Sequence, residues 1–80
     1  MDKLIAVVDD EKDIVDLVNH HLKREGFRVK SFHSGKNFLL YIDSVTPDLT
    51  LLDIMLPGLD GLELCRVLKG RSSTSSMPVI

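Results

Sequence analysis

Two short apolar runs stand out in the pattern of hydrophobic and polar positions, one over Leu4–Val8 and one over Leu49–Leu52. Unbroken runs of β-branched residues and leucine are typical of strands that are buried on both faces of a parallel sheet. The segment Arg28–Phe32 instead alternates polar and apolar residues, which favours a strand at the edge of a sheet. We therefore expect strands over about 3–8, 28–32 and 49–52.

Between the first two strands, apolar residues recur at a four-residue step and predict an amphipathic helix. Acidic residues favour the first turn of a helix, so we expect it to start near Glu11 or Asp13. Gly26 supplies the stop. The apolar stripe consists of Ile14, Val18 and Leu22, widened by Val15 and Leu17.

Two further helices are expected. Ser34 and Gly35 turn the chain into a short helix that the Thr46–Asp48 segment breaks, because proline disfavours helical backbone before it. Asp60 with Glu63 three residues later is typical of a capping box, which predicts a helix through about Lys69. The second helix carries the apolar residues Phe38, Leu39, Tyr41 and Ile42.

The end of the chain is read as a connector followed by a strand. The serine-rich segment 70–76 predicts a flexible polar connector, and 77–80 predicts the beginning of a fourth strand. Strands and helices then alternate along the whole chain, which predicts an α/β fold with a doubly wound parallel sheet, right-handed crossovers and helices on both faces.

Composition is typical of a single soluble globular domain: 80 residues, 44% hydrophobic and 28% charged. Ten basic against twelve acidic residues give a formal net charge of −2, which offers no electrostatic case for direct nucleic-acid binding by this segment. No apolar stretch approaches the roughly 20 residues of a membrane span. The start of the chain lacks a signal-peptide layout, and its single Cys fits a reducing compartment, so we expect a cytoplasmic protein.

Three acids carry the candidate chemistry. Asp9 and Asp10 directly follow the first apolar run, and Asp53 directly follows the second. In parallel α/β sheets, sites form beyond the carboxyl ends of the strands, so these carboxylates converge if the two strands are neighbours. Like charges at that range repel strongly, which implies a cation, and hard oxygen ligands suit Mg²⁺.

Structural roles for the same residues remain open at this point. Acids at the start of a helix often serve only as caps and helix-dipole partners, which covers Asp9 and Asp10, and Asp53 could cap the following turn. Cys65 is expected to be a small buried hydrophobic residue without a redox role. The three histidines, His20, His21 and His33, are expected to be structural or solvated.

Three linked segments resemble the receiver domain of bacterial two-component response regulators. The resemblance covers Lys3 to Ile80. Val7–Glu11 is similar to the family's acidic pair after the first strand, and Pro47–Gly61 is similar to its phospho-acceptor strand and following loop. Met77–Ile80 is similar to the start of its fourth strand. The second segment, at its distance from the first, is highly specific.

This resemblance implies a flavodoxin-like (CheY-like) sheet of strand order 2-1-3-4-5, in which the first and third strands are adjacent. It implies that Asp53 receives a phosphoryl group from a phosphohistidine of a sensor histidine kinase. It further implies that Mg²⁺ is bound by Asp10, Asp53 and the backbone carbonyl of Met55, with Asp9 acting beside the ion or through a bound water. The module would then be a phospho-accepting switch rather than an enzyme, and receivers often precede a DNA-binding output domain that regulates transcription.

The resemblance also shows a departure. The hydroxyl residue at the end of the family's fourth strand and the lysine at the end of its fifth lie beyond Ile80, so residues 1–80 are expected to be an incomplete receiver. We expect slow or absent phosphorylation, and self-association through an open sheet edge beside the third strand. Two other functions remain as alternatives: a receiver-like interaction module without phosphoryl turnover, and an aspartyl-nucleophile phosphatase. The haloacid-dehalogenase-like phosphatases carry a second Asp two residues after the nucleophile, where this chain has Met55.

Overall fold

The computed structural model describes residues 3–53 and 61–80. Three parallel strands form its sheet, β1 (Leu4–Val8), β2 (Arg28–Phe32) and β3 (Leu49–Leu52), in the order β2-β1-β3. The predicted strands and the adjacency of the first and third are thus confirmed. Because β1 lies between two neighbours and under helices, all five of its residues are buried, which explains its unbroken apolar run.

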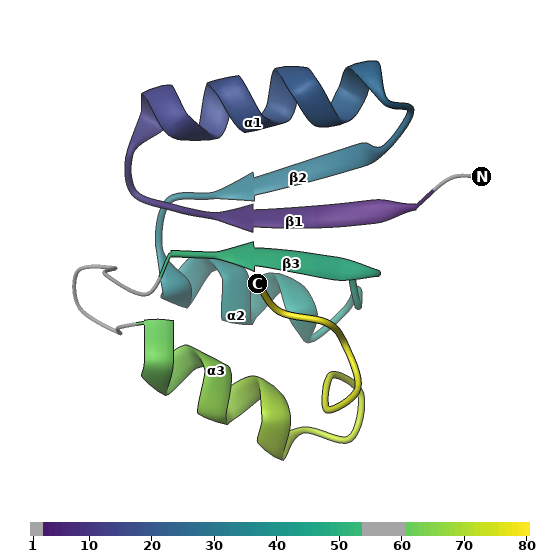
Figure 1. Cartoon of the computed structure of the whole chain (residues 1–80). Helices are drawn as coiled ribbons and strands as arrows, with labels where there is room; N and C mark the ends of the chain where they lie inside the picture. The colour runs from purple at the N-terminus through teal and green to yellow at the C-terminus, as the bar shows by residue number, and fades with distance from the viewer. Residues whose placement is uncertain (1–2, 54–60) are drawn as a thin grey trace.

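The helices cover both faces of the sheet (Figure 1). Helix α1 (Lys12–Arg24) lies on one face, while α2 (Gly35–Ile42) and α3 (Gly61–Gly70) lie on the other. This arrangement confirms the doubly wound α/β architecture. Within the described part of the chain, no helix combines the length and apolar character needed to cross a membrane.

Helix ends follow local chemistry. Helix α1 begins one residue after Glu11, within the expected interval, and the chain leaves it through Gly26 with a φ of 93° that favours glycine. At α2, the Ser34 hydroxyl accepts a hydrogen bond from the Asn37 N–H at 3.2 Å, so Ser34 is the N-cap and Gly35 is already helical. The capping box expected at α3 includes Asp60, which lies outside the described residues.

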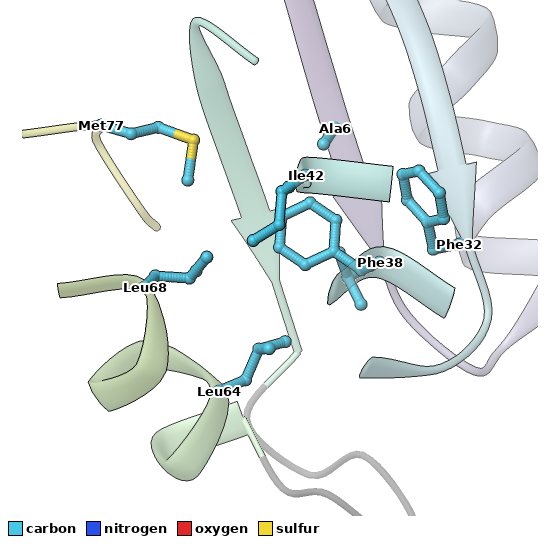
Figure 2. Packing of buried hydrophobic residues seen from close by; sticks show 8 residues of the cluster. Ala6, Phe32, Phe38, Ile42, Leu64, Leu68 and Met77 are labelled. Carbon is cyan, nitrogen blue, oxygen red and sulfur yellow. The ribbon is translucent and has the colours of Figure 1, made fainter. Parts of the chain in front are cut away.

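The larger core cluster fills the space between the sheet and helices α2 and α3 (Figure 2). Phe38 of α2 and Leu64 and Leu68 of α3 have no exposed surface. Phe38 meets Phe32 of β2 with the ring centroids 5.4 Å apart in an edge-on arrangement, a geometry that aromatic pairs favour. The same cluster includes Ala6, Val8, Ile42 and Met77.

A smaller cluster joins the other face of the sheet to α1. It is built on Ile5 and Val7 of β1 and on Val15 of α1, which is 2% exposed. The expected stripe was too wide, because Ile14 and Leu17 are 43% and 59% exposed. The contact is made by Val15 together with Val18 and Leu22, which lie three and seven residues further along the same helical face.

The segment after α3 differs from the expected flexible connector. It forms consecutive turns held by Thr74, which has no exposed surface and whose hydroxyl donates to the Leu68 carbonyl at 2.6 Å. The Lys69 ammonium donates to the Met77 carbonyl at 3.3 Å. The segment is polar but anchored, because the Thr74 hydroxyl satisfies a carbonyl near the end of α3 and Lys69 of α3 bonds the backbone of the segment itself.

The last residues pair with β3, as expected for a strand that is beginning. Thr50 and Val79 form a parallel bridge, and the Leu52 N–H donates to the Ile80 carbonyl at 2.8 Å. The expectation of an open edge beside β3 is therefore wrong. The backbone of 78–80 occupies that edge.

Candidate functional site

The strand register brings the predicted acids to one end of the sheet. The Asp53 N–H donates to the Val8 carbonyl at 2.9 Å, which continues the pairing of β3 with β1 past the last strand residue. The Asp9 N–H donates to the Phe32 carbonyl at 3.0 Å, which continues the pairing of β1 with β2 in the same way. Hydrogen bonds thus connect the C-terminal ends of all three strands where these acids lie. The arrows in Figure 1 point to this side of the sheet.

Three carboxylates converge there. Asp9, Asp10 and Asp53 each have a carboxylate oxygen within 4.8 Å of the others. Asp9 and Asp53 are half-buried, whereas Asp10 is exposed. The convergence expected from the sequence is therefore present. Met55, whose backbone carbonyl was expected to join them, lies outside the described residues.

Asp9 has a structural task as well. Its carboxylate accepts a hydrogen bond from the Glu11 N–H at 2.9 Å, which supports the entry into α1, and Glu11 itself makes no side-chain cap. The bond is a turn that precedes the helix rather than a helix cap, because it satisfies the amide of the N-cap residue Glu11, and it leaves Asp9 within the acidic cluster. The hydrogen bond from the Glu11 amide restricts the Asp9 carboxylate to one orientation, which suits a position beside the ion site.

His33 is a neighbour of the site that the sequence did not indicate. Its Nδ1 lies 3.2 Å from the Asp9 carbonyl oxygen, and its ring is exposed. His33 is the residue that directly follows β2, so it stands at the same end of the sheet as the acids. The strand-end rule that found Asp9 and Asp53 would have found His33 too, had it been applied to the edge strand.

The donor set fits a divalent cation. Each pair of unit charges about 5 Å apart repels by about 1 to 3 kcal/mol at effective dielectric constants of about 80 down to about 20. A hard cation relieves this repulsion, and carboxylate oxygens are its preferred ligands. Oxygens bound to one Mg²⁺ lie up to roughly 4 Å apart, so small side-chain rotations suffice to bring these groups to one ion.

A hollow of about 190 Å³ adjoins the acids. Asp9 and Asp53 line one side of it, and the apolar side chains of Ile14, Val18 and Leu51 line another. Apolar walls weaken the screening of charge by water. The arrangement thus combines a concentrated negative charge with room for a small polar group beside it.

Comparison with known proteins agrees with this geometry. Residues 5–80 match the family model of the response regulator receiver domain. The regulatory protein VanRc of Enterococcus gallinarum is 42% identical over 80 residues, which are 100% of this chain and 33% of that protein. The chain thus spans about a third of the length of this curated relative.

Solved structures show the same fold. The N-terminal domain of a response regulator receiver protein from Methanoculleus marisnigri has a TM-score of 0.91 and 39% identity, covering 96% of this chain and 63% of that chain. The response regulator protein TrrA from Thermotoga maritima, solved in complex with Mg²⁺ and BeF, has a TM-score of 0.83 and 36% identity, covering 88% and 61%. With the family model matched from β1 to the last residue, the chain belongs to the response regulator receiver domains.

Proposed function

We propose that this chain is the phospho-accepting part of a two-component response regulator, with Asp53 as the acceptor. The observation that carries the proposal is the convergence of three carboxylates at the joined ends of β1 and β3. Asp53 is half-buried at the end of the strand that carries it, so its backbone is fixed while its carboxylate faces the site. The proposed donor is a phosphohistidine of a sensor histidine kinase.

The proposed step is a direct displacement at phosphorus. A carboxylate oxygen of Asp53 forms a bond to phosphorus while the bond from phosphorus to the imidazole nitrogen of the donor breaks, and the freed imidazole nitrogen keeps the electron pair and takes up a proton from solvent. Asp10 and Asp53, with the Met55 carbonyl, are the proposed Mg²⁺ ligands, and Asp9 acts beside them or through water. When bound, Mg²⁺ supplies the positive charge that offsets repulsion between the carboxylates and the incoming phosphoryl oxygens.

Two observations support an ion at this place. The carboxylate oxygens are close enough to repel and have the chemistry that Mg²⁺ prefers. The similar protein TrrA was solved with Mg²⁺ and BeF. The hollow beside Asp53 then provides the space for the transferred group.

Titration with Mn²⁺, a paramagnetic substitute for Mg²⁺, tests the ion site separately from phosphorylation. We expect selective broadening of the amide signals of Asp9, Asp10 and Asp53, which Mg²⁺ reverses by competition. Asp10→Asn should weaken the binding of Mn²⁺ at least tenfold. Asp16→Asn, which removes an exposed acid from α1, is the matched control and should leave it unchanged. Equal weakening by both substitutions would show only diffuse attraction to acidic surface.

Incubation with acetyl phosphate and Mg²⁺ tests the acceptor. The expected product, formed slowly, is a single phosphoryl group that hydroxylamine removes and that Asp53→Asn abolishes while Asp16→Asn does not. Ion binding without any labelling, even from a phosphorylated kinase, would favour the interaction module without phosphoryl turnover. Release of many equivalents of phosphate per chain from a phosphate monoester would instead favour a phosphatase, against our proposal that the chain is not an enzyme.

We further propose a cytoplasmic protein whose phosphorylation controls an output such as transcription. The similarity to VanRc, which is named a regulatory protein, supports the output. The net charge of −2 does not favour direct contact of this chain with nucleic acid. The test is the effect of Asp53→Asn, in the protein that carries this chain, on expression of the genes that respond to the cognate kinase.

A further inference from the structure

Strand β2 is the outermost strand in the sheet formed by residues 3–53 and 61–80. The Arg28 N–H donates to the Lys3 carbonyl, and the Phe32 carbonyl accepts from the Asp9 N–H, so these residues face β1. In a parallel pair, the hydrogen-bonding groups of alternate residues point to the same neighbour. The intervening Val29 and Ser31 therefore direct their N–H and C=O groups outward. The outer edge of β2 offers these groups to another extended backbone.

A hollow of about 580 Å³ lies at the beginning of this edge. Its lining comes from both faces of the sheet: Phe27 and Val29 belong with the cluster under α1, whereas Tyr41 packs against the cluster under α2. Because its lining comes from both faces, the hollow runs along the edge of the sheet. An added strand needs this shape, because its successive side chains point to opposite faces.

The charged side chains around the hollow favour an acidic partner. Lys23, Arg28 and Lys30 line the hollow, and all three are exposed. Two acids stand nearby: Glu25 at the end of α1, and Asp48, whose carboxylate accepts from the Leu4 N–H at 2.8 Å. Among the described residues that line the hollow, three are basic and none is acidic, although the chain as a whole has a net charge of −2.

We propose that the β2 edge binds an acidic, extended segment of a partner protein, which adds to the sheet as a strand beside Val29 and Ser31. Lys30 lies on this edge and Lys23 lies beside it, so acidic side chains of the added strand come close to basic ones. A second copy of this chain is a poor occupant, because its β2 would bring the same cations opposite these, and like charges across strands are destabilising. Basic residues on an edge discourage pairing with copies, and the same residues select an acidic strand.

The test uses two ten-residue peptides of alternating Glu and Val, the second with proline in place of every valine. Titration into the isotope-labelled chain should shift the amide signals of Val29 and Ser31 and slow their hydrogen exchange with the first peptide only. Proline keeps the charge but removes the backbone N–H groups that a strand donates. Equal binding of both peptides would reduce the site to electrostatic attraction and overturn the proposal.

Charge variants locate the site. Lys30→Glu should lower the affinity for the first peptide at least about tenfold, as expected when a charge facing an opposite charge is reversed. Lys23→Glu should also weaken binding of the first peptide. Because Lys23 lies outside the sheet, this variant tests the charge even if Lys30→Glu disturbs β2. Lys36→Glu, exposed on α2 and outside the hollow, is the matched control with unchanged affinity. Equal losses in all three, or tighter binding of a ten-nucleotide single strand at the same amides, would refute an acidic peptide as the occupant.

Discussion

Thr74 is a polar residue without exposed surface in a segment that is otherwise rich in exposed serines. Its hydroxyl satisfies the Leu68 carbonyl near the C-terminal end of α3, where the helix leaves carbonyls without partners. A buried acceptor that loses its donor costs more than the bond itself contributes, because the acceptor was already removed from water. Thr74 therefore anchors the path from α3 to the segment that pairs with β3.

We predict that Thr74→Val, which keeps the shape and removes the hydroxyl, lowers the free energy of unfolding by about 1 to 3 kcal/mol. Urea denaturation followed by circular dichroism measures this. Thr46→Val is the matched control, since Thr46 is exposed, and it should change stability by no more than about 0.5 kcal/mol. Equal effects of both substitutions would contradict an anchoring role for Thr74.

At the same scale, the sequence placed some residues of the site and not others. Asp9 and Asp53 could be placed because each ends an apolar run and because parallel strands end at a common edge. His33 follows an edge strand that alternates polar and apolar residues, so no unbroken apolar run marks its position. A local structural role for Asp9 was open from the sequence, but its bond to the Glu11 N–H was not specified, because composition does not fix the residue at which the helix begins.

At the scale of elements, α2 depends on its packing against the sheet, and Phe38 is its largest fully buried side chain. Phe38 has no exposed surface and meets Phe32 of β2 within the core shared with α3. Ser34 caps the helix, but eight residues are too few for a helix to persist on its own in water. Packing through Phe38 therefore stabilises α2 more than its local sequence does.

We predict that Phe38→Leu lowers the free energy of unfolding by about 1 to 3 kcal/mol, because it leaves a cavity between α2 and the sheet. Leu40→Ala on the same helix should cost no more than about 0.5 kcal/mol, since Leu40 is 62% exposed. Thermal or urea unfolding of the two variants gives the comparison. A larger loss for Leu40→Ala than for Phe38→Leu would contradict the placement of the core.

Helix α1 shows what periodicity alone can decide. Its step of three and four residues predicted the helix and one buried face, and the structure confirms both. Periodicity did not show how wide the contact is, so Ile14 and Leu17 were placed in the buried stripe although they are largely exposed. Contact width depends on the curvature and neighbours of the sheet, which the helix sequence does not contain. The same reason applies to 70–76, where polarity concealed a buried threonine.

At the scale of the whole molecule, apolar side chains remain exposed on the α1 side. Ile14, Leu17 and Ile80 are 43%, 59% and 75% exposed, and Ile14 and Ile80 line the hollow beside the acids. Neighbouring exposed apolar residues favour association. We therefore propose that copies of this chain associate through this side.

Sedimentation velocity over a range of protein concentrations tests that proposal. We predict a concentration-dependent increase in sedimentation coefficient that Leu17→Lys reduces, because the substitution places a charge on the apolar surface. Leu62→Lys on α3 is the matched control, as Leu62 is equally exposed at 62% on the opposite side of the sheet. A compact monomer at the highest concentration reached would show that the proposal is wrong.

The hydrogen bond from the Glu11 amide to Asp9 has a consequence for heat resistance. One carboxylate both supports the entry into α1 and stands among the oxygens of the proposed ion site. Occupancy of the pocket and melting of the fold are then thermodynamically linked, and each tenfold rise in free ion above the dissociation constant adds about 1.4 kcal/mol to the folded state. The melting temperature of this small chain would then report how much magnesium surrounds it.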